Sequence, residues 1–103
     1  MLGSLYIDDL KIGEVHFKII DEPMGVIGGE LIANSTYEIY RSRIQNQWKT
    51  KGIANISDFD FKIIVNDIAI EPEGGIGVTE MSGLKEIYVE AAGLSEDIIK
   101  MLS

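Results

Sequence analysis

Cysteine is absent from the sequence of 103 residues. Its absence excludes disulfide bonds, thiolate metal ligands and a cysteine nucleophile, and with them the disulfide framework of many small secreted domains. Long apolar runs are also missing, and charges at Asp8, Asp9 and Lys11 interrupt the segment in which a signal peptide is apolar. We therefore expect a cytoplasmic protein that neither spans nor binds a membrane.

Basic residues are few, since nine lysines and arginines stand against 17 aspartates and glutamates, for a net charge of -8. A field of this sign repels phosphate backbones, so the composition predicts no binding to nucleic acid. Residues 31–52 are the exception, with four basic residues and one acidic residue. One interpretation places these cations near the end of a helix, where they favour its dipole; the other is a patch for an anion or an acidic partner.

The length and composition predict one globular domain over residues 1–103. Hydrophobic residues make up 46% of the chain and charged residues 25%, as in ordinary folded domains. No second composition block or linker marks a further domain.

An internal repeat is the first feature that bears on the fold. A shift of 58 positions lays residues 5–44 over residues 63–102 without a gap. The identical pairs are Asp9/Asp67, Ile12/Ile70, Glu22/Glu80, Gly25/Gly83, Ala33/Ala91 and Glu38/Glu96. Turn signals, glycines and helix starts occur in the same order in both segments, which favours a duplication over coincidence between two amphipathic segments.

Short turns and alternating apolar residues predict strands in both segments. An acidic pair at residues 8–9 separates two apolar runs as a hairpin turn does, and an Asn-Asp pair at 66–67 repeats the pattern. Residues 14–19 alternate strictly, as in a half-buried antiparallel strand. Because the apolar positions are even-numbered before Gly13 and odd-numbered after it, we predict a β-bulge there. Two further strands are expected at Val26–Ala33 and Lys85–Ala91.

A helix is expected at the end of each segment. The first has Ser35 as its N-cap, and Glu38 three residues later completes a capping box. Its apolar stripe, with spacings of three and four residues, consists of Tyr37, Tyr40, Ile44 and Trp48. The second helix starts at Ser95, with acidic residues in its first turn.

These elements define an α+β domain, an antiparallel sheet with two helices in the order β-β-β-α-β-β-β-α. A short additional strand around Ile53–Ile56 joins the halves. If both helices cover one face of the sheet, the opposite face stays partly apolar, and its pairing with another chain predicts a homodimer.

No chemical motif is complete. The glycine-rich stretch 73–77 lacks the lysine of a phosphate loop, and Lys62 stands where a calcium loop opening at Asp58 and Asp60 needs its next oxygen ligand. The single histidine, His16, excludes a two-histidine metal site in one chain, and a solvated or cross-strand-paired histidine is preferred to a catalytic base. The sequence thus predicts no metal and no cofactor, and it favours a non-catalytic protein.

Two functions of different classes follow. The favoured one is a small acidic protein-interaction module, immunity-like or antitoxin-like, whose surface neutralises a basic partner. The alternative is a small-ligand-binding or enzymatic domain with its site between sheet and helix or between dimer subunits. In that site aromatic side chains line a cavity and an arginine holds an anionic group. The candidate binding residues are Tyr40, Arg41, Arg43 and Trp48.

Overall fold

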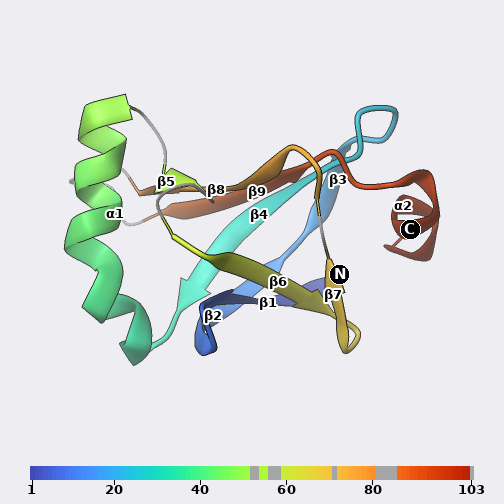
Figure 1. Ribbon diagram of the computed structural model, residues 1–103. Helices are drawn as coiled ribbons and strands as arrows, with labels where there is room; N and C mark the ends of the chain where they lie inside the picture. Colours follow the sequence, from blue (N-terminus) through green and yellow to red (C-terminus); the bar gives the residue numbers. More distant parts are fainter. Residues whose placement is uncertain (52–53, 56–58, 71, 81–85, 103) are drawn as a thin grey trace.

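The computed structural model describes residues 1–51, 54–55, 59–70, 72–80 and 86–102. In this part of the chain, nine strands and two α-helices form an α+β fold, which confirms the predicted class (Figure 1). The strands are β1 (Leu2–Ile7), β2 (Leu10–His16), β3 (Lys18–Asp21), β4 (Val26–Ala33), β5 (Ala54–Asn55), β6 (Phe61–Val65), β7 (Ile68–Ile70), β8 (Gly75–Glu80) and β9 (Ile87–Ala92). The helices are α1 (Glu38–Lys51), preceded by the 3-10 turn η1 (Ser35–Tyr37), and α2 (Glu96–Leu102).

The strands form one antiparallel sheet that curls around the core. Its order is β5-β8-β9-β4-β2-β1-β6-β7, with β3 paired to β4 beside this path. Along one edge, the first half of β4 pairs with β3 and its second half with β2, while β9 occupies the other edge. In Figure 1, β1, β6 and β7 lie below β4, β8 and β9, so the sheet turns back over its own inner face.

The strand expected over residues 10–19 is divided at Phe17 into β2 and β3. The amide of Phe17 donates to the carbonyl of Met1 at 2.7 Å, and the N-terminal ammonium of Met1 donates to the carbonyl of Phe17 at 3.0 Å. From Lys18 onward, the chain pairs with β4 instead. The six strands predicted for the two halves are therefore too few, because the chain also divides between β7 and β8. The expected strand at Ile53–Ile56 is present as β5, while its two end residues lie outside the described residues.

The bulge predicted at Gly13 is confirmed. The register between β1 and β2 shifts after Leu5, and Ile12 is the extra residue on β2. Ile12 and Gly13 are both buried, which moves the inward positions from even to odd numbers. Glycine is also required by space, since an added Cβ would lie 2.5 Å from the carbonyl oxygen of Ile32.

Both predicted hairpin turns are confirmed. Asp8 joins β1 to β2 with a φ of 53°, and Asn66 and Asp67 join β6 to β7 with φ values of 52° and 63°. Asparagine and aspartate tolerate this left-handed region better than most residues, which is why they serve in two-residue hairpin turns.

The first helix begins differently from the prediction. The side-chain oxygen of Asn34 accepts hydrogen bonds from the amides of Thr36 and Tyr37, and its nitrogen donates to the carbonyl of Lys11 on β2 at 2.8 Å. The cap predicted at Ser35 is therefore wrong, because β2 fixes the cap one residue earlier. The capping box is wrong as well, since the carboxylate of Glu38 binds an arginine on the next turn of α1.

The second helix begins as predicted. The hydroxyl oxygen of Ser95 accepts a hydrogen bond from the amide of Ile98 at 3.3 Å, in the geometry of an N-cap. Leu94 and Ile99, on either side of this cap, are both buried.

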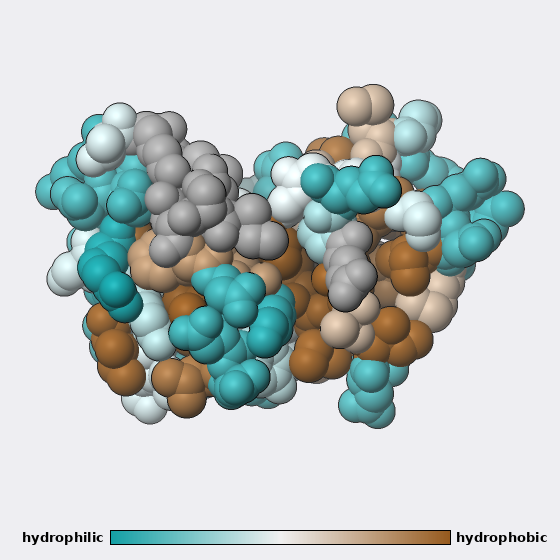
Figure 2. Space-filling view, in the orientation of Figure 1, coloured by the Kyte–Doolittle hydropathy of each residue, from teal (hydrophilic) through white to brown (hydrophobic). Residues whose placement is uncertain are grey.

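The two helices lie at opposite ends of the molecule (Figure 1). The expectation that both cover one face of the sheet is therefore wrong, because the sheet curls and buries its inner face against itself. Figure 2 shows mostly hydrophilic side chains over α1 and a mixture of hydrophobic and hydrophilic side chains over the strands. No helix in the described ranges is long and apolar enough to cross a membrane.

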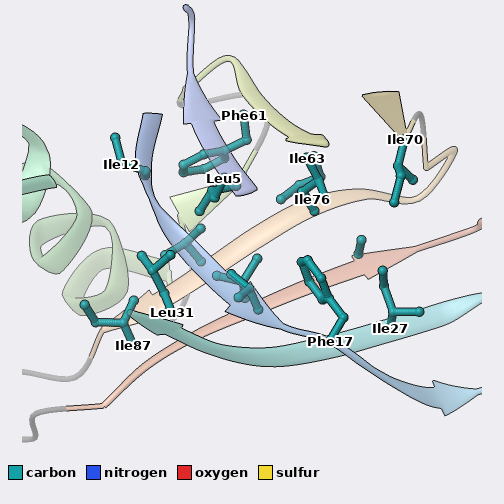
Figure 3. Close-up of a cluster of buried hydrophobic side chains, with 14 of the residues drawn as sticks. Leu5, Ile12, Phe17, Ile27, Leu31, Phe61, Ile63, Ile70, Ile76 and Ile87 are labelled. Atoms are coloured by element: carbon teal, nitrogen blue, oxygen red, sulfur yellow. The ribbon is translucent and has the colours of Figure 1, made fainter. Parts of the chain in front are cut away.

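Inward-facing side chains from both sides of the curled sheet form the core. In Figure 3, side chains from β1 and β6 point toward those from β4 across this space. Leu5, Ile63 and Ile27, one from each of these strands, are completely buried. The helix stripe contributes Tyr37, Tyr40 and Ile44 as predicted, whereas the side chain of Trp48 lies outside the described part of the chain.

The internal duplication stays a prediction. In two antiparallel strand pairs, a residue of segment 5–44 lies opposite its own equivalent in segment 63–102. These pairs are Leu5 with Ile63, between β1 and β6, and Glu30 with Tyr88, between β4 and β9. The hairpins within the segments differ in register. Ile19 pairs with Ile27, whereas Gly77, the equivalent of Ile19, pairs with Glu90, five positions beyond the equivalent of Ile27.

A pair of isoleucines tests the division between the inside and the outside of the sheet. Ile12→Ala removes a side chain that is 0% exposed, and we expect it to lower the free energy of unfolding by about 2–5 kcal/mol. Ile68→Ala, on β7 and 40% exposed, should cost much less, about 1 kcal/mol or below. Urea unfolding followed by circular dichroism measures both, and equal losses would contradict the curl.

Candidate functional site

Glu80 is the buried charged residue of the described chain, with 1% of its surface exposed. It stands at the end of β8, where α1 packs against this strand. Its Oε1 accepts a hydrogen bond from Tyr37 Oη at 2.5 Å. Its Oε2 accepts bonds from Arg41 Nη1 at 2.6 Å and from Gln45 Nε2 at 3.2 Å. We call these four residues the Glu80 cluster.

Arg41 pairs with two carboxylates, that of Glu80 and that of Glu38. The guanidinium of Arg41 also binds the carboxylate of Glu38, with N–O distances of 2.9 and 2.7 Å, and lies 5.2 Å from the centre of the Tyr37 ring. Hydrogen bonding to Glu38 raises the pKa of Arg41, and burial together with the bond to Glu80 raises the pKa of the Tyr37 hydroxyl. Three donors meet the hydrogen-bonding capacity of this buried carboxylate. Their hydrogen bonds hold η1 and α1 against β8.

Arg43 belongs to a separate surface on α1. Its guanidinium lies 5.1 Å from the centre of the Tyr40 ring and 5.4 Å from that of Phe59, and the two rings meet edge to face at 6.2 Å. An open groove of about 440 Å³ runs beside them. It is lined by Ser42, Arg43, Asn46, Gln47 and Phe59.

The four candidate binding residues therefore divide between two environments. Arg43 lines the groove on α1 and lies over the ring of Tyr40, whereas Arg41 binds Glu80 on β8. The side chain of Trp48 lies outside the described residues. Residues two apart on a helix point in different directions, which is why the two arginines do not share one ligand. Of the pair, Arg43 keeps the anion-binding role as a prediction.

A second hollow lies on the outer face of the sheet, among residues for which the sequence predicts no site. It measures about 450 Å³ and spans β2, β3, β4 and β9. We call it the Gly29 groove, and its lining residues are His16, Lys18, Ile20, Gly28, Gly29, Glu30, Ile32 and Tyr88.

Two consecutive glycines form the floor of this groove. A Cβ on Gly29 would collide with the carbonyl oxygen of His16, and one on Gly28 would collide with the hydroxyl oxygen of Tyr88. On the outer face, the hollow therefore lies where Gly28 has no side chain and the phenol of Tyr88 extends over it, whereas Gly29 faces the core and lets the backbone of His16 approach β4. Paired glycines inside a strand are a signal of close backbone approach, and they were the available clue to this site.

The walls of the Gly29 groove are apolar and exposed. Ile20 is 55% exposed, Ile32 is 64% exposed and Tyr88 is 41% exposed. Polar groups surround them on the rim: His16, Lys18 and Glu30 are side chains without a hydrogen bond or ion pair to any other described residue. The groove therefore presents apolar surface together with both signs of charge.

Comparisons with known proteins assign no family to the chain. The sequence matches no protein-family model, and no curated protein and no solved structure is significantly similar to it. Within the described ranges, no three histidine or acidic side chains are grouped as metal ligands would be. The function is therefore inferred from the geometry of the surfaces described above.

Removal of one donor tests the Glu80 cluster. Tyr37→Phe keeps the ring but leaves Oε1 of the buried Glu80 without its donor, and we expect a loss of about 1.5–3 kcal/mol in the free energy of unfolding at neutral pH. Thr36→Ala, in the same 3-10 turn, is the control and should cost less. Urea unfolding measures both variants. If Tyr37→Phe leaves the free energy of unfolding unchanged, the hydrogen bond from Tyr37 to Glu80 contributes nothing to stability.

The same variant predicts a pH dependence. The pKa of Tyr37 is raised in the folded chain above its ordinary value of 10.0, so the stability that it contributes is complete below pH 10 and falls as the unfolded chain ionises above it. The difference in unfolding free energy between the original protein and Tyr37→Phe should therefore shrink above pH 10. Urea unfolding curves recorded below and above pH 10 measure this difference. A difference that stays constant would contradict the raised pKa of Tyr37.

Proposed function

We propose that the protein is a non-catalytic protein-interaction module whose contact surface is the Gly29 groove. The observation that carries this proposal is the grouping of Ile20, Ile32 and Tyr88, three exposed large apolar side chains, around one hollow. Single exposed apolar residues are ordinary on protein surfaces, whereas several around one hollow are typical of a binding surface.

The groove also has the composition of an interface. Protein interfaces combine an apolar centre, often with tyrosine, and a polar rim that specifies orientation. Here Ile32 and Tyr88 supply apolar walls, and Lys18 and Glu30 add a charge of each sign. Because each of these apolar side chains is already about half buried, its complete burial stabilises a complex by about 1–2 kcal/mol before the entropic cost of association.

Rigid backbone underlies this surface. Gly28 and Gly29 lie in the middle of β4, which is paired on both edges, so the hollow is formed before any partner arrives. A preformed hollow requires little rearrangement on binding, which lowers the free-energy cost of association.

Small-ligand binding is the second candidate, and the stacking of Arg43 on Tyr40 and Phe59 supports it. A guanidinium held over two rings beside a groove is suited to an anionic group. The net charge of -8 opposes anions in general, so this candidate ranks below the interaction module.

A matched pair of surface variants tests the interaction module. The tagged chain is used to capture partners from a lysate of its source organism, and the captured proteins are quantified by mass spectrometry. Ile32→Asp should reduce the stoichiometric partner at least about tenfold, because it places a charge in an apolar wall of the surface. Ile39→Asp, on α1 and 67% exposed, should leave capture unchanged.

Either of two results would contradict the proposal. One is equal capture by Ile32→Asp and the original protein. The other is the absence of any stoichiometric partner, counting a second copy of the chain as a partner.

A further inference from the structure

We propose that the partner at the Gly29 groove is a second copy of this chain, in a two-fold dimer closed by ion pairs between Lys18 of each subunit and Glu30 of the other. This inference rests on the proposed function, because it names the partner of the same surface.

A two-fold interface must fit itself, since the same surface comes from both subunits. Such a surface needs a projection and a recess side by side. Ile32 is the projection, because it is 64% exposed and stands between two hollows. One hollow is the Gly29 groove. The other, of about 410 Å³, is lined by Lys11, Gly13, Glu14, Ile32, Ala33 and Asn34.

Charge on the groove is complementary to itself in the same way. Lys18 and Glu30 lie on the outer face of adjacent strands, two positions apart along β4, because Lys18 pairs with Gly28. A two-fold axis that runs within the interface, midway between them, sets each lysine against the glutamate of the partner subunit. Neither residue has an ion pair with another described residue, so both are available.

A second copy fits this surface better than a basic partner does. The chain as a whole has a net charge of -8, which suits a basic partner elsewhere on its surface. The lining of the Gly29 groove departs from that average, since it has one lysine, Lys18, and one carboxylate, Glu30, with Glu90 beside it on β9. A second copy supplies one carboxylate for each Lys18 and one lysine for each Glu30, which a uniformly basic partner does not.

The test is a charge exchange across the two-fold axis, read by sedimentation velocity over a range of concentrations. The original protein should sediment with twice the mass of one chain. Lys18→Glu and Glu30→Lys should each weaken the dimer by about tenfold or more in dissociation constant, because each sets like charges against each other. The double variant, with both substitutions in one chain, should restore the dimer.

A mixture of the two single variants gives a sharper readout. When Lys18→Glu pairs with itself, carboxylates face each other across the axis, and when Glu30→Lys pairs with itself, ammonium groups do. In a mixed pair every acid meets a base, so the equimolar mixture should form more dimer than either variant alone at the same total concentration. Lys100→Glu and Glu73→Lys, which make the same changes of charge on exposed sites outside the groove, are the controls and should leave the dimer intact.

Each result decides the proposal. A monomer at all concentrations up to about 1 mM, where association is already very weak, would overturn the dimer. A dimer whose dissociation constant is the same in Lys18→Glu, in Glu30→Lys and in the original protein would overturn this interface. If the chain is monomeric but Ile32→Asp still abolishes capture of a different protein, the interaction module stands and the second copy is wrong. If capture is also insensitive to Ile32→Asp, both proposals fail.

Discussion

Side chains from two halves of a single sheet fill one core, and the sheet has to curl for them to meet. Two places on one stretch of chain produce this curl. At Ile12 an extra residue shifts the buried face of β2, and at Phe17 the chain leaves β1 and continues along β4. A bulge bends and twists its strand, so the curl begins where the pattern of buried positions changes phase. With the inner face closed in this way, the helices have no open face to cover.

The position of α1 follows from that closure. It lies at one end of the sheet, where its aromatic stripe packs and where Glu80 accepts three hydrogen bonds from η1 and the first turns of α1. A buried carboxylate is costly unless its oxygens have donors, and Tyr37, Arg41 and Gln45 supply them. This cluster uses Arg41 for structure and leaves Arg43 to the aromatic surface beside Phe59.

The outer face of the sheet offers a surface for binding beside the closed core. Its centre is hollow where Gly28 has no side chain, and its walls are apolar. Exposure of these walls to water is unfavourable, and a partner that buries Ile32 and Tyr88 removes that contact. The same curl that closes the core therefore leaves the surface on which the proposed function depends.

Local features of this protein were readable in the sequence by itself. The hairpin turns, the bulge at Gly13, the strand at Val26–Ala33 and the cap at Ser95 depend on a few neighbouring residues, and alternation and turn chemistry are sufficient to place them. The cap at Asn34 was missed because a carbonyl of β2, distant in sequence, selects it over Ser35.

Only the tertiary structure decided which strands pair, where the helices lie and which polar groups meet. Glu80 and Arg41 are 39 positions apart, and Tyr88 reaches Gly28 from another strand, so no local pattern brings them together. These contacts arise from the curl of the whole sheet. Pairing between residues far apart in the sequence depends on how all the elements pack together, so no short stretch of sequence specifies it.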